Sequence, residues 1–372
     1  PIAKASEHLF FALPKYESFL KQWIQDGHVQ APIANKLKEW FKEGLLAWDI
    51  SRDAPYFGFK IPGYDDKYFY VWLDAPIDYI ASFKSLCEER PEIDFNEFWQ
   101  QGSTTELHHF VGKDVVYFHS LFWPAILQSA EYRLPTAVHT HGFLTVNGKK
   151  MSKSRGTFIK AATYLNHLQP EYLRYYYASK LNDQIEDIDL NFEDFKSKVN
   201  SDLVGKVINI ASRCAGFIHK KANGYLSDQI VNEPLLNQFI AAGDSIAKHY
   251  EDRTYAAGMR EIMHLADLAN QYINDQAPWV LAKDPEKEDQ VPGICSLGIH
   301  LFRLLIIYLQ PVMPKLAKDV ADFLNVDTFT WKNIEHTLKR HQINPFKPLM
   351  QRIDPKDIDA LLEDAKEELK AK

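Results

Sequence analysis

The chain has 372 residues, of which 46% are hydrophobic, and its formal net charge is -7 at pH 7. A chain of this size can form two or three globular domains with a sizeable core. Its three widely separated cysteines, Cys87, Cys214 and Cys295, exclude a disulfide framework and a Cys-x-x-Cys metal motif. The sequence has neither a secretory signal pattern nor a long uninterrupted apolar run. We therefore expect a cytoplasmic protein with no membrane association.

Strand and helix signals alternate through the first half of the chain. Residues 14–50 have helical patterns, and the aromatic stretch 68–73 predicts a buried strand that ends at Asp74. Residues 107–111 predict a second strand, followed by a turn over 112–114 in which Asp114 caps a helix over 115–128. A third strand is expected over 137–146, closed by the turn dipeptide Asn147-Gly148. Alternating strands and helices predict a parallel sheet with its ligand at the carboxyl ends of the strands.

The second half of the chain is typical of a helix bundle. Helical patterns cover residues 192–221, 233–251, 254–276, 291–309 and 313–324, and a charged amphipathic helix follows Asp354. The main boundary is expected near Asp189. We predict an α/β fold with a partial Rossmann-like domain and an all-α bundle, in four regions: entry helices 1–50, the nucleotide-binding domain 51–189, the helical domain 190–335, and a linker with a helix packing back on the body, 336–372.

A basic loop follows the third predicted strand. Residues 147–158, NGKKMSKSRGTF, contain three lysines and one arginine but no acid. Lysine side chains are flexible point charges that suit a polyphosphate. A basic run alone is also compatible with a solvated surface loop.

The order of residues in this loop adds a resemblance to a known family. Lys150-Met-Ser-Lys-Ser154 is identical to the Lys-Met-Ser-Lys-Ser signature of class I aminoacyl-tRNA synthetases. The stretches Trp72-Leu-Asp-Ala-Pro76, Gly112-Lys-Asp114, His141-Gly142 and Gln276-Ala-Pro-Trp279 also resemble methionyl-tRNA synthetase, over nearly the whole chain. The resemblance implies ligation of methionine to tRNA(Met) in two steps, with methionyl adenylate as the intermediate. ATP and Mg²⁺ are the implied cofactors.

The family's site residues can be transferred to matching positions here. Lys150 and Lys153 would be catalytic, because preorganised cations stabilise charge as pyrophosphate leaves. They would bind ATP together with Asp114, His141 and Gly142. The implied methionine pocket comprises Trp72, Ala75, Pro76, Tyr79, Phe118, His119 and Trp123. Aromatic walls suit a thioether, although aromatic residues at helical spacing more often pack in a core.

The helical half is expected to bind the anticodon. Six basic residues and one acid lie within 195–222, so positive charge is concentrated there despite the acidic total. By resemblance, the anticodon CAU would contact Asn209, Arg213, Pro278 and Trp279. Aromatic stacking is the usual way to read single-stranded loops. The alternative is that Trp279 packs against the bundle and Arg213 forms a surface ion pair.

Some family features are missing from the sequence. It contains no His-x-Gly-His tetrapeptide and no clustered cysteines, so the zinc site expected in the full-length family has no ligands here. We expect that the family's optional carboxyl-terminal module, the only expected route to a homodimer, is missing as well. We interpret the chain as lacking the first half of the catalytic domain, and expect no catalysis by the chain alone. A non-catalytic RNA-binding module and a class I synthetase for leucine, isoleucine, valine or cysteine remain as alternatives.

Overall fold

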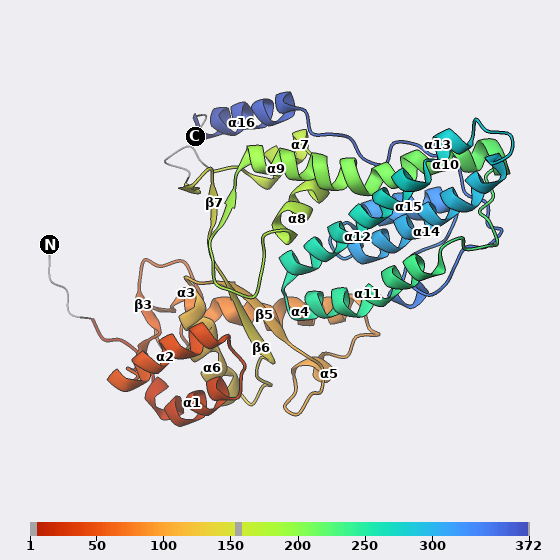
Figure 1. Ribbon diagram of the computed structural model, residues 1–372. Coiled ribbons are helices and arrows are strands. Elements are labelled where there is room, and N and C mark those ends of the chain that lie inside the picture. Colours follow the sequence, from red (N-terminus) through yellow and green to blue (C-terminus); the bar gives the residue numbers. More distant parts are fainter. Residues whose placement is uncertain (1–5, 153–157, 371–372) are drawn as a thin grey trace. The chain divides into compact units, whose positions relative to one another are not determined.

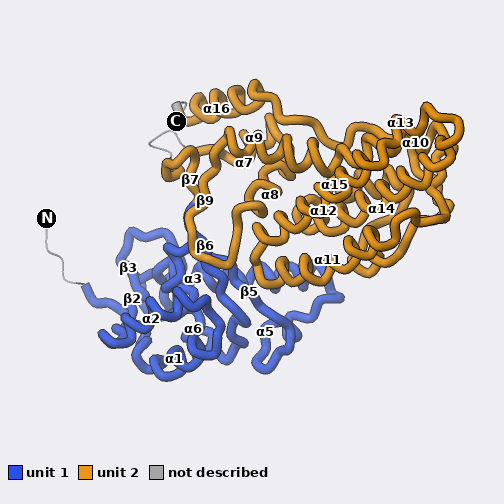
Figure 2. Tube along the Cα trace, viewed as in Figure 1, with its two compact units in different colours: residues 1–143 blue, residues 144–372 orange. Residues whose placement is uncertain are grey.

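The computed structural model describes residues 6–152 and 158–370 (Figure 1). The chain divides into two compact units, residues 1–143 and 144–372 (Figure 2). The predicted functional boundary at Asp189 remains a prediction. Each unit is described by itself below.

The first unit mixes short strands with helices, as its alternating signals predict. Its helices are η1 (Leu13–Tyr16), α1 (Glu17–Gln25), α2 (Ala31–Glu43), α3 (Val71–Asp74), η2 (Ala75–Ile77), α4 (Asp78–Glu89), α5 (Phe95–Trp99), η3 (Phe118–Phe122) and α6 (Trp123–Ser129). Its strands are β1 (Phe10–Phe11), β2 (Trp48–Asp49), β3 (Ser51–Asp53), β4 (Lys67–Phe69), β5 (His108–Gly112) and β6 (Ala137–His141). Antiparallel pairs join β1 to β2 and β3 to β4.

The parallel pair β5–β6 confirms the predicted parallel pairing. Its register runs from His108 opposite Ala137 to Gly112 opposite His141. The backbone N–H of Lys113 then donates to the carbonyl of His141 at 3.0 Å, which joins the carboxyl ends of the two strands. The turn after β5 leads into a continuous helix over residues 116–129. This helix begins after Val115, so the prediction that Asp114 caps it is wrong.

The predicted strand over 68–73 is also only partly right. Only Lys67–Phe69 forms a strand, and Val71–Asp74 is helical. The partner β3 has only three residues, and its last pair joins Ser51 to Phe69. In the part of the chain that the structure describes, no strand pairing continues beyond this pair to hold the aromatic residues extended. The turn closes instead through a hydrogen bond from the Leu73 N–H to the Tyr70 carbonyl, at 2.8 Å.

The second unit begins with a small three-stranded sheet. It contains β7 (Leu144–Val146), β8 (Lys149–Lys150) and β9 (Ile188–Leu190), with β7 central. The single strand predicted over 137–146 is therefore two strands in different sheets, because residues 142–143 interrupt it. The predicted Asn147-Gly148 turn is confirmed: both residues have positive φ, 47° and 73°, and they close the β7–β8 hairpin.

A helix bundle forms the rest of the second unit, as predicted. Its helices are α7 (Ala161–His167), α8 (Pro170–Ala178), α9 (Phe192–Lys198), η4 (Val199–Ile208), α10 (Asn209–Ala222), α11 (Glu233–Glu251), α12 (Tyr255–Gln276), α13 (Pro278–Leu281), η5 (Glu288–Gln290), α14 (Val291–Leu309), α15 (Pro314–Leu324), η6 (Trp331–Asn333) and α16 (Pro355–Lys370). The η3 and η4 segments are π-helical, which the sequence pattern does not predict.

Helix α14 lies at the centre of the bundle, in contact with α10, α11, α12 and α15 (Figure 1). Nearly all its side chains are buried, so its apolar residues form the core rather than a single stripe. Among the described residues, one segment, Glu288–Leu309, is long and apolar enough to cross a membrane. Because 94% of its most apolar window is buried inside the protein, a core helix accounts for it.

The last helix, α16, packs against α7. Two ion pairs join them: Lys160 with Glu368 and His167 with Asp364, each at 2.7 Å. Lys160 is the residue just before α7, so the carboxyl-terminal helix fixes the segment that follows the basic loop.

Candidate active site and anticodon-binding surface

The predicted methionine pocket forms an aromatic wall in the first unit. The rings of Trp72 and Phe118 are stacked, with centroids 4.4 Å apart and planes 7° apart. Trp72 comes from α3 and Phe118 from the π-helical η3, so two local departures from the predicted elements bring the rings together. A π-helical turn moves side chains out of α-helical register and is frequent at functional sites.

His119, the next residue in η3, has both ring nitrogens engaged. Its Nδ1–H donates to the Val115 carbonyl at 3.0 Å, and its Nε2 accepts the Tyr79 hydroxyl at 2.9 Å. Only 3% of His119 is exposed, and burial lowers its pKa, although the bond to Val115 acts in the opposite direction. Burial therefore favours the neutral form of His119. Tyr79 is 39% exposed, and burial of part of its ring raises its pKa.

A second histidine supports the wall from behind. The indole N–H of Trp123 donates to Nε2 of His109 at 3.1 Å, and burial lowers the pKa of His109 to about 4. Trp123 is completely buried in a cluster with Trp99 and Leu127. Its hydrogen bond therefore holds His109, whose ring centroid lies 4.9 Å from that of Tyr79 and 5.9 Å from that of His119. Of the other predicted pocket residues, Pro76 is buried in η2 and Ala75 is exposed.

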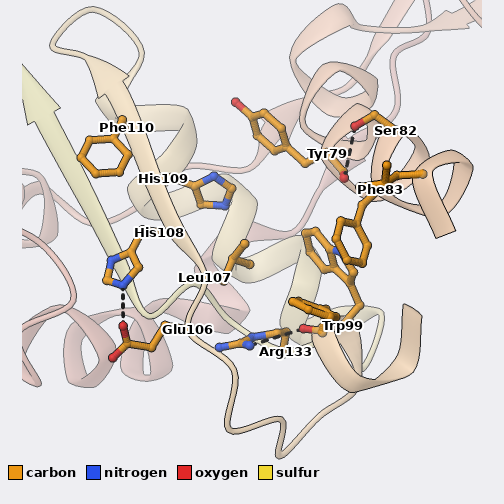
Figure 3. Close-up of a pocket in the computed structure, with 12 residues that line it drawn as sticks. Tyr79, Ser82, Phe83, Trp99, Glu106, Leu107, His108, His109, Phe110 and Arg133 are labelled. Atoms are coloured by element: carbon orange, nitrogen blue, oxygen red, sulfur yellow. Dashed lines mark hydrogen bonds and ion pairs between the residues drawn. The ribbon is translucent and has the colours of Figure 1, made fainter. Parts of the chain in front are cut away.

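A cavity of about 450 Å³ opens beside Tyr79 and His109 (Figure 3). Phe83, Trp99, Phe110 and Arg133 also line it, but Trp72, Phe118 and His119 do not. The structure thus pairs Trp72 with Phe118 and Tyr79 with His119, and of these four residues Tyr79 lines the cavity.

The predicted ATP-binding residues of the first unit lie at the carboxyl ends of β5 and β6. A Cβ atom on Gly112 would lie 2.6 Å from Oδ1 of Asp114, so glycine permits this carboxylate its position. His141 donates from Nδ1 to the carbonyl of Gly142 at 2.8 Å, and the rest of its side chain is exposed. These residues occupy the edge where parallel sheets bind ligands.

The basic loop begins on the β7–β8 hairpin of the second unit. Lys150 is exposed in β8, opposite Thr145, whereas Lys153 lies outside the described residues. Asp189 fixes the base of the hairpin: one of its oxygens accepts from the Thr145 hydroxyl and from the Gly148 N–H, both at 2.7 Å. Sequence reasoning placed Asp189 only at a boundary and missed this role.

The predicted anticodon residues form one surface of the helix bundle. The guanidinium of Arg213 lies over the ring of Trp279, 4.5 Å from its centroid, and also donates to Oδ1 of Asn274 at 2.5 Å. One turn earlier on α10, Asn209 donates to Asn270 at 3.1 Å. Trp279 is 37% exposed at the start of α13, and Pro278 before it is buried. The structure thus brings Arg213 and Trp279 together.

The surrounding positive charge is largely paired. Of the six basic residues of 195–222, four contact carboxylates: Lys196 with Glu193, Lys198 with Asp202, Lys206 with Asp267, and Lys221 with Glu288. Simple counting of charges therefore overestimates the positive field. Arg213, which bonds an amide and a ring instead of a carboxylate, is the cation that the site itself contributes.

The comparisons with known proteins agree with this arrangement. The family model described as tRNA synthetases class I (M) matches residues 1–215, and the chain belongs to this class I ligase family. A second model, the anticodon binding domain of methionyl tRNA ligase, matches residues 223–350. Together they identify the particular family as methionyl-tRNA synthetase.

Solved structures show the same fold. The chain is similar to Mycobacterium tuberculosis methionyl-tRNA synthetase in complex with methionyl-adenylate, with 24% identity and a TM-score of 0.81 over 93% of this chain and 69% of that chain. The free-state structure of the M. tuberculosis enzyme is similar as well, with 22% identity, a TM-score of 0.78 and the same shares covered.

Proposed function

We propose that this chain ligates methionine to tRNA(Met) in two steps as part of a methionyl-tRNA synthetase. In the first step, a carboxylate oxygen of methionine attacks the α-phosphorus of ATP, and the bond to the β-phosphate breaks to release pyrophosphate. In the second, a terminal ribose hydroxyl of the tRNA attacks the methionyl carbonyl, and AMP leaves. The M. tuberculosis relative, whose structure holds methionyl-adenylate, supports this sequence of steps.

The observation that carries the amino-acid assignment is that the polar side-chain atoms of Tyr79 and His119 already have hydrogen-bond partners within the protein. Tyr79 and His119 bond each other, and the second nitrogen of His119 is held by the Val115 carbonyl. The wall therefore offers ring faces and edges without an unpaired charge. Such a surface favours a thioether, which makes favourable contacts with aromatic rings and forms only weak hydrogen bonds.

The nucleotide would lie at the carboxyl ends of β5 and β6, near Asp114, His141 and Gly142. Lys150 and Lys153 would neutralise the charge that develops on the departing pyrophosphate. Mg²⁺ supplies further neutralisation when it accompanies the phosphates, and needs few protein ligands for this. Among the described residues, no group of three or more His, Cys, Asp or Glu side chains could hold a metal ion. The described residues do not fit a zinc site, and no step is assigned to zinc.

The helical domain would select the tRNA. Trp279 offers an exposed ring on which a base can stack, and Asn209 and Arg213 present polar groups to base edges. Methionine, ATP and tRNA(Met) are thus the proposed partners. We also propose that the chain alone is inactive in catalysis, because its sequence lacks the His-x-Gly-His tetrapeptide that holds the nucleotide phosphates in this family.

Calorimetry with methionyl and leucyl adenylate analogues tests the amino-acid assignment. The chain is expected to bind the methionyl analogue at least about tenfold more tightly, because a thioether fits the aromatic wall and a branched chain does not. Equal affinity for both analogues would contradict the assignment. ATP–pyrophosphate exchange by the chain alone is expected to be absent, and measurable exchange would refute only the inactivity.

A further inference from the structure

The consecutive segments η4 and α10 are joined to α12 by three side-chain pairs at one constant offset. Lys206 with Asp267, Asn209 with Asn270, and Arg213 with Asn274 are each 61 residues apart. Both members of the pairs advance together along the chain, so the two helical segments run parallel and in register (Figure 1). The middle pair differs from the other two because both partners are amides, whose hydrogen-bonding role depends on which way each amide is turned.

The orientation of the Asn270 amide is set by the backbone around it. Its Nδ2 donates to the carbonyl of Lys206 at 3.0 Å and to the carbonyl of Ala266 at 2.9 Å. A backbone carbonyl can only accept hydrogen bonds, so the NH₂ end of Asn270 must face these two oxygens. Both its hydrogens are then used, and its Oδ1 is the atom that faces α10.

This orientation dictates the orientation of Asn209. Because Asn270 presents only an acceptor, Asn209 must turn its NH₂ group toward it, and the bond is 3.1 Å long. One N–H and the carbonyl oxygen of Asn209 remain, in a fixed order, for a ligand. Asn209 is partly exposed and lies one turn from Arg213, which contacts Trp279.

We infer that Asn270 is a specificity-determining positioning residue of the anticodon site, because it fixes the order in which Asn209 presents its donor and acceptor. The inference rests on the proposed function. Cytosine and adenine both present an amino donor next to a ring-nitrogen acceptor, whereas uracil and hypoxanthine present a carbonyl next to an N–H. An amide held in one orientation can form two hydrogen bonds with only one of these edges, and a freely flipping amide can pair with both.

The test uses anticodon stem-loops that differ only in this polarity. The chain is titrated with loops bearing CAU, with UAU (cytosine to uracil), and with CIU (adenine to inosine). In the unchanged chain at least one replacement is expected to weaken binding by about tenfold or more, which is the usual range for a lost pair of base contacts. The measured quantity is the ratio of the dissociation constant of the replaced loop to that of the CAU loop. In Asn270→Ala this ratio is expected to fall close to one, because Asn209 can flip and bind the carbonyl-bearing loop.

Asn270→Asp separates polarity from structural support. A carboxylate still accepts from Asn209 but cannot donate to the carbonyls of Lys206 and Ala266, so it retains the polarity and loses the support. The Asp variant is expected to keep the ratio within about twofold, even if it is less stable. Asn270→Ser repeats the alanine test if Asn270→Ala does not fold. The serine hydroxyl can donate to the carbonyl of Ala266, four residues earlier, and so keeps part of the structural support.

Asp267→Ala is the matched control from the neighbouring pair of the same two segments, and its ratio should not change. Two results would overturn the inference alone: an unchanged ratio in Asn270→Ala and Asn270→Ser, or equal loss of the ratio in the Ala and Asp variants. Failure of the unchanged chain to bind any stem-loop would instead overturn the proposed function, and the inference with it.

Discussion

The guanidinium of Arg213 lies 4.5 Å from the ring centroid of Trp279, while one of its nitrogens donates to Asn274. The cation covers part of one ring face, and 37% of the tryptophan remains exposed. A cation over an aromatic ring is attracted by the electron density of its face. The contact therefore holds the indole in one position, which would lower the entropy cost of stacking a base on it.

Replacing Trp279 with alanine is expected to weaken binding of a CAU stem-loop by about 1–3 kcal/mol, the usual contribution of one stacked base. Fluorescence anisotropy with a labelled stem-loop measures this change. Val280→Ala is the control, because Val280 is the exposed neighbour in the same short helix and has no role in stacking. An unchanged affinity in Trp279→Ala would exclude this residue from the site.

Replacing Tyr79 with phenylalanine keeps the ring and removes the hydroxyl that Nε2 of His119 accepts. His119 would keep its bond to Val115 but lose the partner that fixes its other edge. Binding of the methionyl adenylate analogue is expected to weaken by about 0.5–1.5 kcal/mol, measured by calorimetry. Tyr132→Phe, which removes a hydroxyl elsewhere in the unit, should have no effect. Equal loss in both variants would indicate a general loss of structure.

The bundle is expected to lose stability in acid through His300. This residue is fully buried in α14, and among the described residues neither of its ring nitrogens has a hydrogen-bond partner. Burial lowers its pKa to about 3, and the positive charges of Arg303, His336, Lys339 and His341 act in the same direction. The unfolded histidine has a pKa of about 6.5, so the unfolded chain binds the proton first as the pH falls.

The contribution of His300 is therefore complete above about pH 6.5 and is lost between about pH 6.5 and 3, at about 1.4 kcal/mol per pH unit. In urea unfolding, the free energy of unfolding of His300→Leu should decrease less between pH 7.5 and pH 5 than that of the unchanged chain. His264→Leu, which removes an exposed histidine of α12, should keep the full decrease. The same decrease in both variants would contradict the assignment to His300.

Replacing two glycines of the bundle with alanine is expected to have opposite effects on stability. A Cβ atom on Gly298 would lie 2.6 Å from the sulfur of the buried Cys214, whereas one on Gly216 would meet nothing within 4 Å. Gly298→Ala is expected to lower the free energy of unfolding by about 1–3 kcal/mol through overpacking. Gly216→Ala is expected to raise it by up to about 1 kcal/mol, because alanine favours a helix. Urea unfolding that gave both variants the same sign would contradict the packing of α10 against α14.

Much of the fold is predictable from local patterns. The predicted helices 233–251 and 291–309 coincide with α11 and α14. A proline near the start marks both helices in the sequence, and α11 also has an acid in its first turn and basic residues in its last. The Asn147-Gly148 turn is equally clear, because few other dipeptides accept positive φ at both positions. The π-helical segments η3 and η4 were missed because they depend on packing, and the sequence around them is compatible with an ordinary α-helix.

The residues of the candidate site were found from family motifs, while their supporting partners were not. Asn270 and Asn274 lie on α12, 61 residues from Asn209 and Arg213, and no local pattern links such distant positions. Val115 supports His119 through its backbone carbonyl, which any residue would provide, so the sequence carries no signal for it. Side-chain identity is thus predictable at motif positions, whereas the orientation of those side chains depends on tertiary packing.

Anticodon recognition by the helical unit underlies the proposed function, and one binding measurement tests it directly. The affinity of the chain for a CAU stem-loop is compared with that for the same stem carrying the anticodon GAC, at one fixed salt concentration. We predict that the CAU loop binds at least about tenfold more tightly, because base contacts contribute beyond the shared phosphate charge. Equal affinity for the two loops would contradict the assignment of this chain to methionine tRNA.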